Sequence, residues 1–189
     1  MNVYITGVGG QGIGLLSGVL LRACAHAGMR VQGVDTHGLA QRGGIVVSHI
    51  RSGVDGASPM IVPGEADLVL ALERHEALRA CIGQLRDGGV LAWYDAVWQP
   101  WAVRCGASPQ TGLEEIDEAC SRRGIRALRV FDPLLPDPRM QNVALLAALI
   151  REELVEGLGA PHVERALEDL LSGTALRLNL DLFRSRTGA

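Results

Sequence analysis

The sequence contains no lysine, because all eighteen of its basic residues are arginine. This absence excludes a P-loop of the kind that holds ATP phosphates with a lysine. It also excludes a lysine that forms a Schiff base with a carbonyl substrate or with pyridoxal phosphate. We attribute the absence to genomic base composition, and the exclusions hold regardless.

Cysteine is scarce and scattered. The four cysteines, Cys24, Cys81, Cys105 and Cys120, include no C-x-x-C pair, a spacing common among iron–sulfur and structural zinc ligands. The five histidines show no ligand spacing either. We therefore expect no metal site on this chain, and no histidine motif accompanies a cysteine that would make it a nucleophile.

Long apolar runs are also missing. The longest, Val143 to Ile150, is far too short to cross a bilayer, and the N-terminus lacks the basic and apolar segments of a signal peptide. The net charge is −3 and no basic run occurs, which argues against nucleic-acid binding. We expect a cytoplasmic protein that binds neither membranes nor nucleic acids.

Glycine is abundant, at 24 of 189 residues, and strand-like and helix-like patterns alternate over residues 1–135. The expected strands are Val3–Thr6, Val31–Val34, Ile45–Arg51, Asp67–Glu73, Val90–Tyr94 and Arg126–Phe131. The expected helices between them are Gly12–Ala27, Arg74–Leu85, which the Gly88-Gly89 pair follows, and Thr111–Arg123, where Thr111 and Glu114 suggest a capping box.

Residues 136–189 read as entirely helical. The expected helices are Asp137–Glu153, Pro161–Leu171 and Thr174–Ser185. The whole pattern predicts one α/β domain with a mostly parallel, doubly wound, Rossmann-like sheet covered on both faces. The helical tail either packs on that sheet or forms a subunit interface.

The first expected strand leads into a glycine-rich turn. Gly7, Gly9 and Gly12 form a G-x-G-x-x-G motif between a strand and a helix, and Gly10 and Gln11 lie within it. Backbone N–H groups and the positive end of the helix dipole make such a turn suited to a phosphate or another anion. Tight packing of the helix on the strand is the alternative role of these glycines.

Four expected strands end in an acid: Asp35, Glu73, Asp95 and Asp132. The carboxyl ends of parallel strands line the ligand crevice of an open α/β sheet, although some acids there simply cap the next turn. Asp35 follows Gly12 by the interval at which a dinucleotide-binding fold places its ribose-binding acid.

A second polar loop follows Asp35 and gathers His37, Gln41, Arg42, Gly43 and Gly44. The Arg42 guanidinium suits a carboxylate or phosphate, and His37 can change charge near neutral pH. Arg42 either contacts a ligand or partner subunit, or pairs with a strand-end acid to hold the loop. We expect both loops to lie at one rim of the sheet.

These loops resemble the gamma-type domain of the 2-oxoacid:acceptor oxidoreductase family, and most of all the beta subunits of its indolepyruvate:ferredoxin branch. The matching segments are GVGGQG at 7–12, HGLAQRGG at 37–44 and VSHIR at 47–51. Further matches are Ser58-Pro59, 64–67, Asn142-Val143 and Leu145-Leu146. The chain departs from the family pattern at Ala147, where a glycine is usual, and in the aromatic segment Trp93–Trp101.

The resemblance implies a non-catalytic subunit of a complex that oxidatively decarboxylates 2-oxoacids to acyl-coenzyme A and reduces ferredoxin. Thiamine diphosphate, Mg and 4Fe-4S clusters would then belong to a larger subunit. The two loops would shape the shared active-site crevice or the coenzyme A path. Homo-oligomerisation stays open, and a stand-alone nucleotide- or NAD(P)-binding module is the alternative.

Aromatic residues are few, but four fall within nine positions: Trp93, Tyr94, Trp98 and Trp101. Tryptophan and tyrosine are favoured at protein interfaces, while covering the sheet edge within the chain is the alternative. We expect at least one of Trp98 and Trp101 to be exposed.

Overall fold

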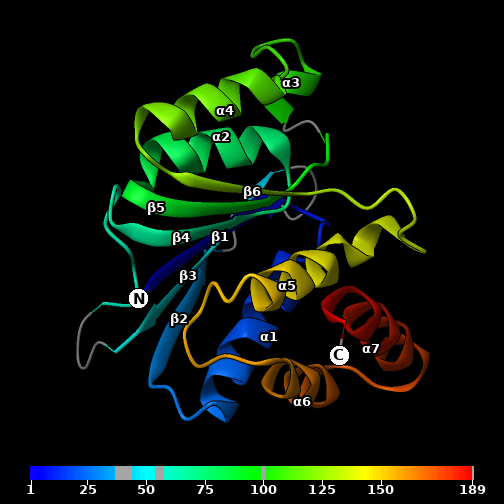
Figure 1. Cartoon of the computed structure of the whole chain (residues 1–189). Coiled ribbons are helices and arrows are strands. Elements are labelled where there is room, and N and C mark those ends of the chain that lie inside the picture. Colours follow the sequence, from blue (N-terminus) through cyan, green and yellow to red (C-terminus); the bar gives the residue numbers. More distant parts are fainter. Residues whose placement is uncertain (37–43, 54–57, 99–100, 189) are drawn as a thin grey trace.

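The computed structural model describes residues 1–36, 44–53, 58–98 and 101–188. Six strands form one sheet in the order β2-β3-β1-β4-β5-β6, with helices on both faces (Figure 1). The strands are β1 (Asn2–Val8), β2 (Val31–Thr36), β3 (Ile45–Ser52), β4 (Ala66–Ala71), β5 (Leu85–Tyr94) and β6 (Arg126–Val130). The helices are α1 (Ile13–His26), α2 (Arg74–Gly83), α3 (Trp101–Arg104), α4 (Leu113–Arg122), the short 3₁₀ helix η1 (Pro138–Met140), α5 (Gln141–Arg151), α6 (Ala160–Leu170) and α7 (Gly173–Thr187).

The sheet is mostly parallel, as the sequence predicts. Strands β1, β4, β5 and β6 pair in parallel, whereas β3 pairs antiparallel with both β1 and β2. Because β3 is antiparallel to both neighbours, β2 points in the same direction as β1, and their carboxyl ends share a rim. The inserted β3 nevertheless separates β2 from β1, which are adjacent in the usual dinucleotide-binding order.

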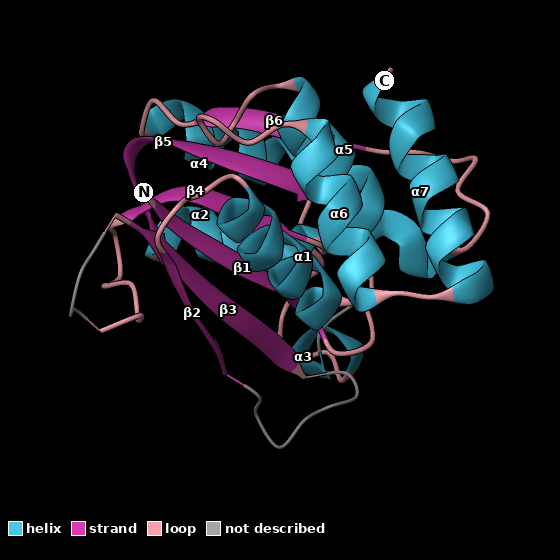
Figure 2. Cartoon of the chain, turned by 90° about the horizontal axis from the view of Figure 1, so that it is seen from below, coloured by secondary structure: helices cyan, strands magenta, loops and turns pink. Residues whose placement is uncertain are grey.

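Two helical layers cover the sheet. Helices α1, α5, α6 and α7 lie on one face, and α2 and α4 lie on the other (Figures 1 and 2). On the first face, Val143, Leu145 and Leu146 of α5 share a core with Leu16 and Leu20 of α1. Full burial of such a side chain stabilises the fold by about 1.5–3 kcal/mol. Of the helical tail, α5 packs on the sheet, while α6 packs on α1 and α7 packs on α5.

Two expected element boundaries are wrong. The N-cap of α4 is Gly112, which has no side chain to form a capping box, and the Thr111 hydroxyl lies 2.9 Å from His75 Nδ1 instead. Strand β5 begins already at Leu85, so the Gly88-Gly89 pair lies inside a strand. The pairing of β4 with β5 shifts register there, and Gly88 has a φ of 70°, which explains the glycine at an irregular strand position.

Within the described residues, no helix combines the length and apolarity that crossing a bilayer requires.

Candidate functional site at the carboxyl rim of the sheet

The glycine turn joins β1 to α1 through residues 9–12. The Gly9 N–H donates to the Gly44 carbonyl at 2.8 Å, and the Gln11 N–H donates to the Val8 carbonyl at 3.1 Å. Gly10 and Gly12 adopt φ values of 105° and 79°, a region that glycine occupies without steric cost. Two of the turn's amides are thus used by the fold itself.

Gln11 fastens this turn to the sheet. Its side chain is buried, its Oε1 accepts the Val8 N–H at 2.7 Å, and its Nε2 donates to the Leu72 carbonyl at 2.5 Å. Leu72 follows β4, so one amide group bridges two parallel strands. The sequence motif makes Gln11 a candidate for cofactor binding, and in the structure both its amide atoms form contacts within the chain.

The start of α5 closes against the start of α1. Asn142 Nδ2 donates to the Gly12 carbonyl at 3.2 Å, and a Cβ built on Gly12 would lie 2.5 Å from that nitrogen. A Cβ on Gly7 would lie 2.9 Å from Gln11 Oε1. Gly7 and Gly12 therefore serve close packing. The residues alone did not single out Asn142 for the site; the family motif around it was the available signal.

Trp98 lies beside the turn. A Cβ on Gly10 would lie 3.4 Å from the Trp98 ring, and Trp98 is 39% exposed. The expectation that Trp98 or Trp101 is exposed is thus confirmed by Trp98; the Trp101 side chain lies outside the described residues. Ile45 and Val97 are also exposed. In contrast, Trp93 and Tyr94, the other two residues of the aromatic segment, are buried.

The strand-end acids are engaged inside the chain. Asp35 accepts a hydrogen bond from Ser17 Oγ at 3.0 Å, and Glu73 accepts the Glu76 N–H at 3.0 Å as the N-cap of α2. The other two acids form ion pairs, Asp95 with Arg74 and Arg129, and Asp132 with Arg186. Because β3 separates β2 from β1, Asp35 is not on the strand next to the glycine turn, where the ribose-binding assignment would require it.

The second polar loop returns to the same rim. Thr36 ends β2, and Gly44 precedes β3 and accepts the hydrogen bond from Gly9. The expectation that the two loops share a rim is therefore confirmed by the described ends of the second loop. The other candidate site residues of that loop lie outside the described part of the chain. They are His37, Gln41, Arg42 and Gly43.

Three of the four thiols are buried. Burial raises the pKa of Cys24 to about 11, so this group is a neutral thiol at physiological pH. Cys81 and Cys120 face each other from α2 and α4 with their sulfur atoms 3.6 Å apart. Cys105 is exposed. Among the residues that the structure describes, no group of three histidine, cysteine or acidic side chains is placed to hold a metal ion.

The sheet and its helical cover define an α/β protein, and comparison with known proteins gives its family. The chain matches the pyruvate ferredoxin/flavodoxin oxidoreductase family over residues 2–186, and it belongs to that family. It is 37% identical to the indolepyruvate oxidoreductase subunit IorB of Methanothermobacter thermautotrophicus, over 100% of this chain and 96% of that protein. It is 33% identical to the IorB subunit of Archaeoglobus fulgidus, over 95% and 90% of the two chains. The resemblance inferred from the loop motifs is confirmed.

Solved structures share the fold. The gamma subunit of a keto/oxoacid ferredoxin oxidoreductase from Geobacter sulfurreducens is similar with a TM-score of 0.66 and 18% identity, over 99% of this chain and 96% of that chain. The 2-oxoglutarate:ferredoxin oxidoreductase of Magnetococcus marinus, solved with 2-oxoglutarate, coenzyme A and succinyl-CoA bound, is similar with a TM-score of 0.64 and 18% identity. That similarity covers 100% of this chain but 31% of that chain. In the latter protein the fold is therefore one part of a longer polypeptide.

Proposed function

We propose that the chain is the small, non-catalytic subunit of a 2-oxoacid:ferredoxin oxidoreductase of the indolepyruvate or arylpyruvate type. Its rim completes the active-site or coenzyme A crevice of a larger subunit, which carries thiamine diphosphate, Mg and the iron–sulfur clusters. Similarity to IorB subunits over nearly the full length of both chains supports this assignment.

The arrangement of the rim is the observation that carries the proposal. The glycine turn, Gly44 and the exposed Trp98 meet there, while Gln11 and the strand-end acids are held by contacts within the chain. A rim whose strand-end acids are already engaged within the chain suits one wall of a pocket that receives its reactive groups from another polypeptide.

The start of α1 fits an anionic group of a ligand such as coenzyme A, whose thiol accepts the acyl group. Gly10 and Gly14 are exposed there, and a Cβ built on Gly14 would meet no atom within 4 Å. The N-terminal end of a helix carries a partial positive charge that attracts phosphate or carboxylate. Residues 10–14 would therefore orient the anion, without a proton transfer by this chain.

Reconstitution tests the proposal. The chain alone and the chain co-expressed with the larger subunit are assayed for indolepyruvate-dependent ferredoxin reduction in the presence of coenzyme A. We expect turnover only from the complex. Turnover by the chain alone overturns the proposal, and micromolar NAD(P) binding by the chain alone, weakened by Asp35→Ala, replaces it with the stand-alone nucleotide-binding module.

Trp98→Ala sharpens the test. It is expected to lower turnover of the complex about tenfold or more, because a large aromatic contact at the shared rim is lost, while the melting temperature of the isolated chain changes little. The matched control is Ile82→Ala, an exposed apolar residue on α2. Equal loss of turnover in both variants would contradict a specific role for Trp98.

A further inference from the structure

A second surface lies beside the end of β6, the last strand of the sheet, where the residues that follow β6 meet α5 and the end of α7. It consists of two depressions that meet at Arg186. One has a volume of about 320 Å³ and includes Arg129, Arg151 and Arg186 in its lining. The other has a volume of about 240 Å³ and includes Leu134 and Leu178. We call the two together the Arg186 surface.

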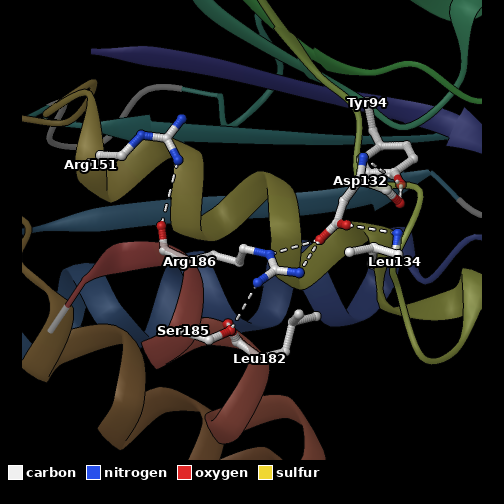
Figure 3. Close-up of polar contacts among 7 residues, drawn as sticks. All are labelled: Tyr94, Asp132, Leu134, Arg151, Leu182, Ser185 and Arg186. Atoms are coloured by element: carbon white, nitrogen blue, oxygen red, sulfur yellow. Dashed lines mark hydrogen bonds and ion pairs between the residues drawn. The ribbon is translucent and has the colours of Figure 1, made fainter.

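The central pair of this surface is rigid. Arg186 Nε and one terminal guanidinium nitrogen each lie 2.7 Å from Asp132 Oδ2, and Asp132 Oδ1 accepts the Leu134 N–H at 2.9 Å (Figure 3). The Tyr94 hydroxyl donates to the Asp132 backbone carbonyl at 3.1 Å. These contacts hold the segment after β6 against α7, and they fix the position of the Arg186 guanidinium at the junction of the two depressions.

The positive charge around this pair is only partly compensated. The Asp95 carboxylate is shared by Arg74 and Arg129, and the Glu152 carboxylate is shared by Arg126 and Arg151. Each of these carboxylates thus faces two guanidinium groups. Asp181 adds one carboxylate to the lining of the second depression, so three arginines and two acids, Asp132 and Asp181, line the surface.

Arg151 is the most weakly held of these arginines. Its side chain is 50% exposed, and its polar contacts with described residues, to Glu152 Oε1 and to the Arg186 carbonyl, are both 3.5 Å long. Figure 3 shows Arg151 reaching from α5 toward the end of α7. The protein as a whole has a net charge of −3, so this positive surface is a local feature.

Exposed apolar side chains flank the charges. Leu134 is 79% exposed and Phe131 is 59% exposed, the former being the most exposed large apolar side chain among those described, and Leu178 on α7 is also exposed. The Arg129 guanidinium lies 6.0 Å from the centre of the Phe131 ring. Apolar side chains clustered next to arginine are typical of protein interfaces rather than of free surface.

We propose that the Arg186 surface binds a segment of the larger subunit that carries carboxylates beside large apolar side chains. This inference rests on the proposed function, because it requires that partner. A small anion would engage the arginines but leave Leu134 and Phe131 in water. A two-fold dimer through this surface would bring its guanidinium groups against their own copies, so charge complementarity favours a different, acidic chain.

The test uses two variants of the surface and two matched controls. Arg151→Glu reverses the weakly held charge, and Leu134→Asp places a charge on the apolar part. The controls make the same changes on the opposite face of the sheet: Arg122→Glu on α4, where Arg122 is 73% exposed, and Ile82→Asp on α2. Each variant is co-expressed with the larger subunit, and the dissociation constant is measured. Circular dichroism melts of the isolated chains verify folding.

We expect Arg151→Glu and Leu134→Asp each to weaken association with the larger subunit about tenfold or more. The melting temperatures of the isolated chains and the affinities of the two control variants should not change. The effect of Arg151→Glu should shrink at high salt, because it is electrostatic. Wild-type affinity in both surface variants would overturn the inference while leaving the proposed function intact. Failure of the wild-type chain to associate would overturn the proposed function itself.

Two further outcomes would assign the surface to another occupant and overturn the inference. One is a wild-type homodimer that Leu134→Asp dissociates, measured by analytical ultracentrifugation. The other is stabilisation by inorganic phosphate or citrate of the wild-type chain but not of Arg151→Glu.

Discussion

The glycine turn and the Arg186 surface differ in how their polar groups are used. In the turn, the Gln11 amide is buried and bonded to the backbone on both sides. At the Arg186 surface, the guanidinium groups outnumber the carboxylates of the lining and are partly exposed. Buried polar groups with complete hydrogen bonding fix one geometry, whereas exposed charges are available to a partner. Substitutions in the turn should therefore affect folding, and substitutions at the surface should affect association.

The largest expected effect on stability is that of Gln11→Ala. The variant leaves the Val8 N–H and the Leu72 carbonyl buried without their partner, so the free energy of unfolding should fall by about 2–4 kcal/mol. Urea denaturation followed by circular dichroism measures this loss. Gln84→Ala, at the half-buried end of α2, is the control and should cost well under about 1 kcal/mol. A similar loss in both variants would show that the cost is not specific to the glycine turn.

The next effect is that of Gly12→Ala. The new Cβ would sit at a φ of 79° and 2.5 Å from Asn142 Nδ2, so we expect a loss of about 1–3 kcal/mol. Gly14→Ala is a stringent control, because Gly14 lies in α1 with open space around a Cβ, and it should stabilise by about 0.5–1 kcal/mol. Adding Asn142→Ala to Gly12→Ala should recover part of the loss in a double-mutant cycle. Additive losses would show that the two residues do not interact.

The smallest effect concerns pH. His49 on β3 is buried, burial lowers its pKa, and its Nδ1 accepts the Ile61 N–H at 3.1 Å. The neutral form is favoured in the folded protein, so its contribution to stability is complete above the unfolded pKa of about 6.5 and is lost as the pH falls below it. Arginine stays charged throughout this range, so the Arg186 surface should not contribute to this change.

Unfolding free energies measured between pH 8 and pH 5 test this expectation. The wild-type chain should lose stability by an amount of order 1 kcal/mol or less, and His49→Gln should flatten that pH dependence. An unchanged profile in His49→Gln would assign the pH dependence to other groups.

Local patterns predicted most helices and strands, but not the strand order. The β-branched run of β3 looks the same whether it pairs parallel or antiparallel, and its place between β1 and β2 depends on contacts far along the chain. The short helix α3 had no periodic signal. The start of α4 was misplaced because Thr111 matched a capping pattern, while its hydroxyl lies against His75.

The sequence predicted where the candidate site lies but not which side chains are engaged within the chain, because those contacts also depend on the strand order. The glycine motif located the turn, and the loops meet as expected because parallel strand ends share a rim. Gln11 is a candidate ligand contact because it lies within the glycine motif that the family shares. Its burial against Leu72 became visible only once β4 lay beside β1. The pairing of Asp35 with Ser17 likewise depends on the packing of α1 over β2.

The contact of Asn142 with Gly12 joins the last quarter of the polypeptide to its first turn. A protein truncated after residue 135 would lose this hydrogen bond. It would also lose the apolar contacts that Val143 and Leu146 make with α1. The remaining protein would then expose the apolar side chains of α1 to water, and the glycine turn would be less constrained. The segment 136–189 is therefore required for the rim, because its removal would withdraw the contacts that support the start of α1.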